Sequence, residues 1–129
     1  MKLISIIFCL FFSINLYSQT TKIDSLISKY GLEKQILDDW KKDKYGCKKL
    51  RSSHARKLEN NEKIIGIHIK EFLSLFGTPN KINRDQLYVY KVYANCNRKN
   101  NKLKDTNYAE LVAAFNNDKL ISISLLITE

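Results

Sequence analysis

Residues 66–79 read Gly66-Ile67-His68-Ile69-Lys70-Glu71-Phe72-Leu73-Ser74-Leu75-Phe76-Gly77-Thr78-Pro79. The apolar residues of this stretch recur at helical spacing and predict a short amphipathic helix. Gly77 and Pro79 end the pattern, because glycine favours the left-handed C-terminal position and proline cannot continue a helix. The sequence before this stretch is helical or basic, and the sequence after it has the period of β-strands.

The first 18 residues have the pattern of a secretory signal peptide. Met1-Lys2 is a short basic start, an apolar run follows from Leu3 to Leu16, and Ser18 offers a small residue for cleavage. At about 14 residues the run is short for a membrane span, which needs roughly 18 or more. An uncleaved anchor is the alternative. We therefore expect a periplasmic or secreted protein, cleaved near Ser18, with no transmembrane segment in the mature chain.

The chain has three cysteines. Cys9 lies inside the apolar run and follows a bulky residue, so we interpret it as part of the signal segment and not as a lipidation site. Cys47 and Cys96 remain, and an even count in an oxidising compartment predicts a disulfide. Closing a loop of about 50 residues would stabilise the fold by roughly 4 kcal/mol in the chain-entropy description. Two free, buried thiols are the alternative.

The chain is strongly basic, with a net charge of +9. Eight cations fall within residues 41–57, opposed only by Asp43: Lys41, Lys42, Lys44, Lys48, Lys49, Arg51, Arg56 and Lys57. Such a segment favours acidic proteins or anionic lipid headgroups as partners. Nucleic acid is excluded as a partner because an exported chain rarely meets it. A solvated face that aids solubility is the alternative.

Two apolar runs at helical spacing precede the basic segment. Gly31 separates them, and they predict one helix with a weak point or two short helices. Their members are Ile23, Leu26, Ile27, Tyr30, Leu32, Ile36, Leu37 and Trp40. A narrower stripe predicts a further helix, with Cys47, Leu50, His54 and Leu58 on one face.

After Pro79 the sequence predicts three strands, at residues 86–93, 108–115 and 120–128. Residues 97–105 are polar and predict a hairpin loop. In the last strand we expect Ile121, Ile123, Leu125 and Ile127 to face inward. The prediction is therefore an α+β fold in which N-terminal helices pack on a three-stranded antiparallel β-meander. Residues 19–129 form one domain, helical and basic over 19–79 and β over 80–129.

The helix ending in Phe76-Gly77-Thr78-Pro79, followed by a tyrosine-rich strand and two further strands, resembles the SmpA/OmlA (BamE-like) family. The resemblance covers about half of the mature chain. It implies two helices paired with a three-stranded antiparallel sheet, as in the related β-lactamase-inhibitor-protein-like fold. It also implies a small periplasmic binding module. The lipid-anchoring cysteine of that family has no counterpart here.

No residue group in the sequence identifies a catalytic, cofactor or metal site. Asp39 and Asp43 share a helical face, but lysines surround them, so a solvated salt-bridged surface is the favoured interpretation. Cys47 and His54 offer a thiol and a base without an orienting third group. His54 and His68 do not have zinc-ligand spacing with the cysteines, and we expect His68 to be a half-buried helix residue.

The sequence therefore favours a non-catalytic binding or assembly module of the bacterial cell envelope that acts through protein–protein contacts. The expected partner is an envelope protein or the anionic membrane surface. The candidate binding surface combines cations with tyrosines, which are enriched at interfaces: Lys44, Lys48, Lys49, Arg51, Tyr88, Tyr90 and Tyr108. The alternative is a small secreted enzyme, or an inhibitor of one, whose site the sequence does not identify.

Overall fold

The computed structural model describes residues 19–96 and 103–128. Residues 19–29 are helical. The elements that follow are α2 (Lys34–Lys42), α3 (Leu50–Glu59), a 3₁₀ turn (Glu62–Ile64), α4 (Ile69–Phe76), β1 (Lys81–Ile82), β2 (Leu87–Cys96), β3 (Leu103–Asn116) and β4 (Lys119–Thr128). The predicted signal segment at residues 1–18, with Cys9, lies outside the described residues.

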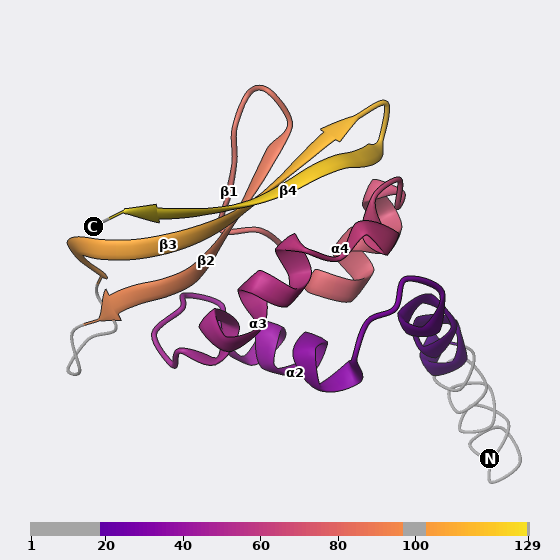
Figure 1. Ribbon diagram of the computed structural model, residues 1–129, viewed down its shortest axis with the longest axis horizontal. Helices are drawn as coiled ribbons and strands as arrows, with labels where there is room; N and C mark the ends of the chain where they lie inside the picture. Colours follow the sequence, from indigo (N-terminus) through magenta and orange to yellow (C-terminus); the bar gives the residue numbers. More distant parts are fainter. Residues whose placement is uncertain (1–18, 97–102, 129) are drawn as a thin grey trace, which may run out of the picture.

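The strands form one antiparallel sheet in the order β1-β2-β3-β4. Helices α2, α3 and α4 lie together against one face of this twisted sheet (Figure 1). The prediction of an α+β fold with an antiparallel sheet is therefore confirmed. Two details were wrong: the sheet has four strands and not three, and α4 lies in the middle of the chain, so the helices are not all N-terminal. The two-residue strand β1 was missed because it is too short to show an alternation.

The central stretch forms α4 with the predicted ends. The ring of His68 accepts a hydrogen bond from the backbone N–H of Lys70 at 3.2 Å and caps the first turn. At the other end Gly77 has φ +74° and donates its N–H to the carbonyl of Leu73 at 2.8 Å. His68 is half-buried as expected, but it precedes the helix as its N-cap.

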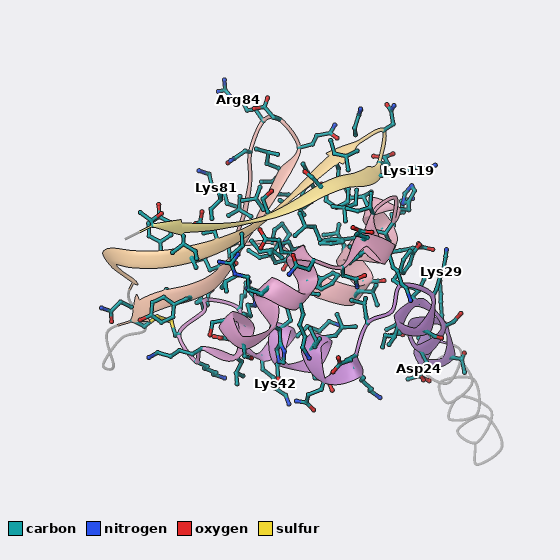
Figure 2. The ribbon with its side chains drawn as sticks, in the orientation of Figure 1. Asp24, Lys29, Lys42, Lys81, Arg84 and Lys119 are labelled. Atoms are coloured by element: carbon teal, nitrogen blue, oxygen red, sulfur yellow. A yellow bond between two sulfur atoms is a disulfide. The ribbon has the colours of Figure 1, made fainter. Side chains whose placement is uncertain are left out.

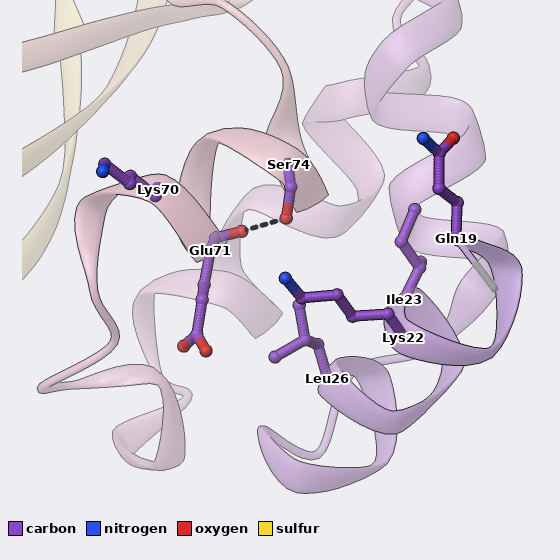
Figure 3. Close-up of a pocket in the computed structure, with 7 residues that line it drawn as sticks. All are labelled: Gln19, Lys22, Ile23, Leu26, Lys70, Glu71 and Ser74. Atoms are coloured by element: carbon purple, nitrogen blue, oxygen red, sulfur yellow. Dashed lines mark hydrogen bonds between the residues drawn. The ribbon is translucent and has the colours of Figure 1, made fainter. Parts of the chain in front are cut away.

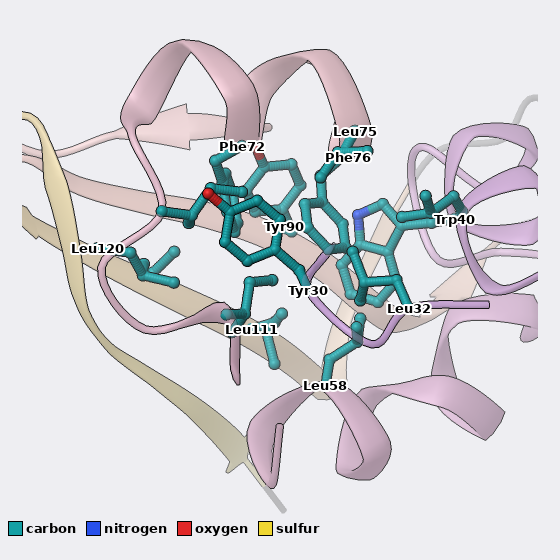
Figure 4. Close-up of a cluster of buried hydrophobic side chains, with 14 of the residues drawn as sticks. Tyr30, Leu32, Trp40, Leu58, Phe72, Leu75, Phe76, Tyr90, Leu111 and Leu120 are labelled. Carbon is teal, nitrogen blue, oxygen red and sulfur yellow. The ribbon is translucent and has the colours of Figure 1, made fainter. Parts of the chain in front are cut away.

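A cluster of aromatic rings fills the space between the helices and the sheet (Figure 4). The ring of Phe72 lies 4.5 Å from that of Phe76 and 6.0 Å from that of Tyr90, measured between centroids. The ring of Trp40 lies 6.0 Å from both Phe76 and Tyr90. These contacts join α2, α4 and β2, so the predicted central helix packs at the middle of the core.

Gly31 separates two helices, which agrees with the second of the two alternatives. It has φ +60°, a conformation that ends a helix, and the chain resumes helical structure at Lys34. Of the predicted stripe of the third helix, Leu58 is buried as expected. The positions that α3 buries are Arg51, Ala55 and Leu58, whereas Leu50 and His54 are half-buried.

The strands differ from their predicted limits and faces in two places. Strand β3 begins at Leu103, so the predicted polar loop at 97–105 is shorter than expected. In β4, Ile123 and Leu125 face the helices, but Ile121 is 55% exposed and Ile127 is 57% exposed. The register between β3 and β4 shifts near the start of β4. There Leu120 pairs with Phe115 and takes the buried position instead of Ile121.

Candidate functional site

The basic segment folds into the end of α2, the start of α3 and a loop between them at residues 43–49, here called the pinned loop. The disulfide between Cys47 and Cys96 joins this loop to the end of β2, with 5.5 Å between the two Cα atoms (Figure 2). This pairing is the one that the sequence predicted. Ala94 of β2 also donates its backbone N–H to the carbonyl of Gly46 at 3.2 Å.

Gly46 lets the pinned loop lie directly on the backbone of β2. Its φ is +72°, and a Cβ at this position would come within 2.9 Å of the backbone nitrogen of Tyr93 and the carbonyl carbon of Val92. Only glycine fits such a close approach of two backbones without displacing one of them. The sequence signal for this contact was the pair Tyr45-Gly46, which predicted a turn but not its partner.

Asp43 is buried, at 2% exposure, and holds the start of α3 from inside the pinned loop. Its carboxylate accepts the backbone N–H groups of Lys48 at 3.0 Å and Leu50 at 2.9 Å. The N–H of Leu50 belongs to the first turn of α3, where N–H groups have no intrahelical partner, so the carboxylate stabilises the start of this helix. The expectation that Asp43 belongs to a solvated salt-bridged surface was therefore wrong.

Arg51 is buried as well, at 2% exposure, although we expected it on a docking surface. Its Nε donates to the carbonyl of Trp40 at 2.7 Å, and its Nη1 donates to the carbonyls of Lys44 at 3.0 Å and Lys91 at 2.9 Å. The guanidinium also lies 4.8 Å from the ring of Trp40. Arg51 thus ties α2, the pinned loop and β2 together, and packing accounts for this cation.

Asn80 completes the attachment, and no sequence pattern predicted its role. Its amide nitrogen donates to the carbonyl of Lys44 at 2.8 Å, while its oxygen accepts the backbone N–H of Lys91 at 2.8 Å. The carbonyl of Lys44 therefore receives two side-chain hydrogen bonds, one from Asn80 and one from Arg51. The backbone of the pinned loop is held from α3, β2 and the segment before β1.

The lysine side chains in and beside the pinned loop are exposed. Lys42, Lys44, Lys48 and Lys49 are all open to solvent, and Tyr45 beside them is 50% exposed. Figure 2 shows Lys42 pointing away from the body of the molecule. A hollow of about 270 Å³ lies here, lined by Lys42, Asp43, Lys44, Tyr45, Cys47 and Lys48. Because the carboxylate of Asp43 is engaged by backbone N–H groups, the hollow presents cations around an exposed aromatic ring.

The three tyrosines of the predicted surface differ in their exposure to solvent. Tyr90 is fully buried and donates its hydroxyl to the carbonyl of Gly77 at 2.8 Å, and burial raises its pKa above the ordinary value. Tyr88 is half-buried against Phe115, with 4.9 Å between ring centroids. Only Tyr108 of the three is exposed, at 41%. Of the predicted surface residues, Lys44, Lys48 and Lys49 are therefore exposed, whereas Arg51 and Tyr90 are buried.

His54 does not meet Cys47 as a catalytic pair, because Cys47 is in the disulfide. Its Nε2 lies 2.8 Å from Oδ2 of Asp39, and Gln35 donates to the other oxygen of Asp39 at 2.9 Å. The hydrogen bond from His54 is the largest cause that lowers the pKa of Asp39 below its ordinary value. Over residues 19–96 and 103–128, no cluster of three or more histidines, cysteines or acids could hold a metal ion.

A second hollow, of about 300 Å³, separates the helical residues 19–29 from α4 (Figure 3). Ile23 and Leu26 form its apolar side, and Lys22 extends from the helix towards Ser74 and Glu71. The carboxylate of Glu71 is already engaged, since it accepts the hydroxyl of Tyr30 at 2.7 Å. The polar groups at this groove join its two walls and do not converge on a common point.

Comparison with family models, curated proteins and solved structures finds no match to this chain. Among the helices of the described part, none has the length and apolar character needed to cross a membrane.

Proposed function

We propose that this chain is an exported, non-catalytic binding module of the bacterial cell envelope. In this proposal its pinned loop docks on an acidic surface of a partner protein. The observation that carries the proposal is the contrast between buried and exposed charged side chains within residues 41–51. The buried groups Asp43 and Arg51 bond to backbone groups of the loop region, whereas its lysine side chains are left in solvent.

A fixed backbone that carries exposed cations suits recognition of an acidic surface. Binding costs conformational entropy, and that cost falls when the loop already has its bound conformation. Complementary charge mainly raises the association rate and selects against basic partners. Tyr45 adds an exposed aromatic ring among the lysines, and its ring lies 5.8 Å from the Nζ of Lys44. Aromatic residues are frequent at the centres of protein interfaces.

The envelope location and the SmpA/OmlA resemblance are parts of the same proposal. A Cys47–Cys96 disulfide is what an oxidising compartment maintains. An antiparallel sheet with helices on one face agrees in outline with the architecture that the resemblance implies.

The test compares two variants that lose equal charge. The loop variant replaces Lys42, Lys44, Lys48 and Lys49 with glutamine. The control variant replaces four exposed lysines outside the pinned loop with glutamine: Lys34, Lys63, Lys81 and Lys119. Far-ultraviolet circular dichroism and thermal melting first establish that both variants fold like the parent.

Each protein is then tested for association with solubilised envelope proteins and with phosphatidylglycerol vesicles at low and high salt. We expect the loop variant to bind envelope protein about tenfold or more weakly, since four surface charges each contribute up to roughly 1 kcal/mol. The control variant should retain most of the binding, and high salt should weaken the parent. An equal loss of binding in both variants would mean that the pinned loop is only a solvated face. A loss seen only with vesicles would make the membrane surface the partner.

A further inference from the structure

A small cavity lies beside the pinned loop, between the end of α2 and the turn that follows α4. Its volume is about 110 Å³, and its lining residues are Lys41, Lys44, Arg51, Phe76, Gly77 and Thr78. Water occupies about 30 Å³ per molecule in the liquid, so the cavity has room for a few waters or one small oxyanion. Its lining contains three cationic residues and no acidic one.

Arg51 has donors left over at this cavity. The printed partners of its guanidinium, the carbonyls of Trp40, Lys44 and Lys91 together with Asn80, all engage Nε or Nη1. No acceptor within the described residues bonds to Nη2. Within the described residues, the only fully buried side-chain nitrogen or oxygen without a hydrogen-bond partner is Nε1 of Trp40. Nη2 therefore keeps some contact with solvent, and Arg51 is one of the residues that line the cavity.

The charge at the cavity persists at neutral pH. Burial lowers the pKa of Arg51 to about 10, while the nearby carboxylate of Asp43 opposes that shift. Lys41 adds a second cation at the cavity, and its Nζ donates to the carbonyl of Ser74 at 3.3 Å. An arginine that is almost fully buried but retains two N–H donors can still donate to an anion, because Arg can donate five N–H bonds.

We propose that this cavity binds a carboxylate of the acidic partner, an Asp or Glu side chain that Nη2 of Arg51 and the ammonium of Lys41 hold together. The inference rests on the proposed function, since it names the chemical group through which the partner docks beside the pinned loop. Charge-assisted hydrogen bonds to carboxylates are among the stronger ones in proteins.

The proposed function favours a carboxylate over a phosphate, because the partner that it names is an acidic protein surface. The lining residues with side-chain donors are Arg51, through Nη2, Thr78, through its hydroxyl, and Lys41 and Lys44, through their ammonium groups; Lys41 already makes one hydrogen bond. The ring of Phe76 also lines the cavity and offers an apolar contact for the methylene group of an acidic side chain.

The experiment is an NMR titration of the ¹⁵N-labelled protein with sodium acetate at constant ionic strength. The signals followed are the Nε–H of Arg51 and the backbone amides of Gly77 and Thr78. We expect saturable shifts at all three. In Lys41→Gln the dissociation constant should rise about three- to fivefold, as for loss of one partly exposed charge. In Lys81→Gln, which removes an exposed lysine of β1, it should not change. Arg51 itself stays intact, so folding is not at risk.

Two further anions separate the sources of an oxyanion. Methanesulfonate has the charge of acetate but three oxygens, and it should bind more weakly. Inorganic phosphate stands for a lipid headgroup or the free ion. Saturation by methanesulfonate or phosphate where acetate fails would overturn the carboxylate assignment. Linear, unsaturated drift with acetate, or equal weakening in Lys41→Gln and Lys81→Gln, would overturn the site.

The outcome is distinguishable from failure of the proposed function. If acetate does not saturate the cavity but the four-lysine loop variant loses partner binding, the docking surface stands and the carboxylate site falls. If acetate saturates the cavity but the loop variant binds envelope proteins like the parent, the proposed function falls instead.

Discussion

The carboxylate of Asp43 and the guanidinium of Arg51 are both 2% exposed, yet each bonds mainly to the backbone and no ion pair joins them within the described chain. Asp43 accepts N–H groups at the start of α3, and Arg51 donates to carbonyls of α2, the pinned loop and β2. Their charges still act on one another, because Asp43 opposes the effect of burial on the pKa of Arg51. The two residues share the task of fixing residues 43–49.

Replacing Asp43 with asparagine should destabilise the fold. The substitution removes the negative charge that offsets Arg51, and an amide group matches two N–H donors poorly. We expect the free energy of unfolding to fall by about 2–4 kcal/mol, within the range for a disrupted buried charge. Urea unfolding measures it. Asp38→Asn removes an exposed charge from α2 and should change the stability by less than about 0.5 kcal/mol. Similar values for both variants would contradict the capping role of Asp43.

Replacing Arg51 with glutamine should also unfold the protein more easily, whereas Lys48→Gln should not. Glutamine cannot reach the carbonyls of Trp40 and Lys91 together, so it leaves buried acceptors without donors. The expected loss is about 3–5 kcal/mol. Lys48 is exposed and serves as the matched control. A melting temperature of Arg51→Gln equal to that of Lys48→Gln would contradict the structural role of Arg51.

Alanine at Gly46 should cost more than alanine at Gly66. Both glycines have positive φ, +72° and +87°, so both substitutions carry the backbone cost of roughly 1–2 kcal/mol. Only at Gly46 does the new Cβ meet backbone atoms at 2.9 Å, while nothing lies within 4 Å of it at Gly66. Chemical denaturation of the two variants should separate them by at least about 1 kcal/mol. Equal losses would mean that the pinned loop does not rest on β2.

Removing the disulfide should lower stability without changing the fold. The double variant Cys47→Ser, Cys96→Ser opens a loop with a sequence separation of 49 residues, which the chain-entropy description puts at about 4 kcal/mol. Peptide mapping without reductant should recover one linked pair from the parent. If both cysteines are instead alkylated without prior reduction, the parent should melt no higher than the double variant.

The hydrogen bond between His54 and Asp39 predicts that the stability of the fold changes with pH in the acidic range. The pKa of Asp39 is lower in the folded chain than in the unfolded chain. The contribution of Asp39 to stability is therefore present above its pKa in the unfolded chain, about 3.9. It is lost as the pH falls through the pKa in the folded chain. In His54→Ala the pKa of Asp39 should rise towards the ordinary value in a carboxyl NMR titration. Asp38→Asn should leave it almost unchanged. No rise in His54→Ala would contradict His54 as the main cause.

Local patterns predicted the helices and strands whose signals lie within a few residues of one another. The glycine and proline after Phe76 predicted the end of α4. The alternation from Ala109 to Phe115 predicted the face of β3 that is buried at Leu111, Ala113 and Phe115. The errors at β1 and Ile121 have the same origin. A strand of two residues has no period, and a shift of register depends on the partner strand, which is not visible in the local sequence.

The sequence by itself determined the α+β class, the helix that ends at Gly77 and the pair of cysteines, because periodicity, terminator residues and an even cysteine count are local or compositional. Only the tertiary structure decided which cations belong to the surface. Lys48 and Arg51 look alike in a basic segment, yet α3 turns Arg51 towards the backbone carbonyls of Trp40 and Lys91 and leaves Lys48 in solvent. Those acceptors lie 11 and 40 residues away along the chain, and folding alone brings them to the guanidinium.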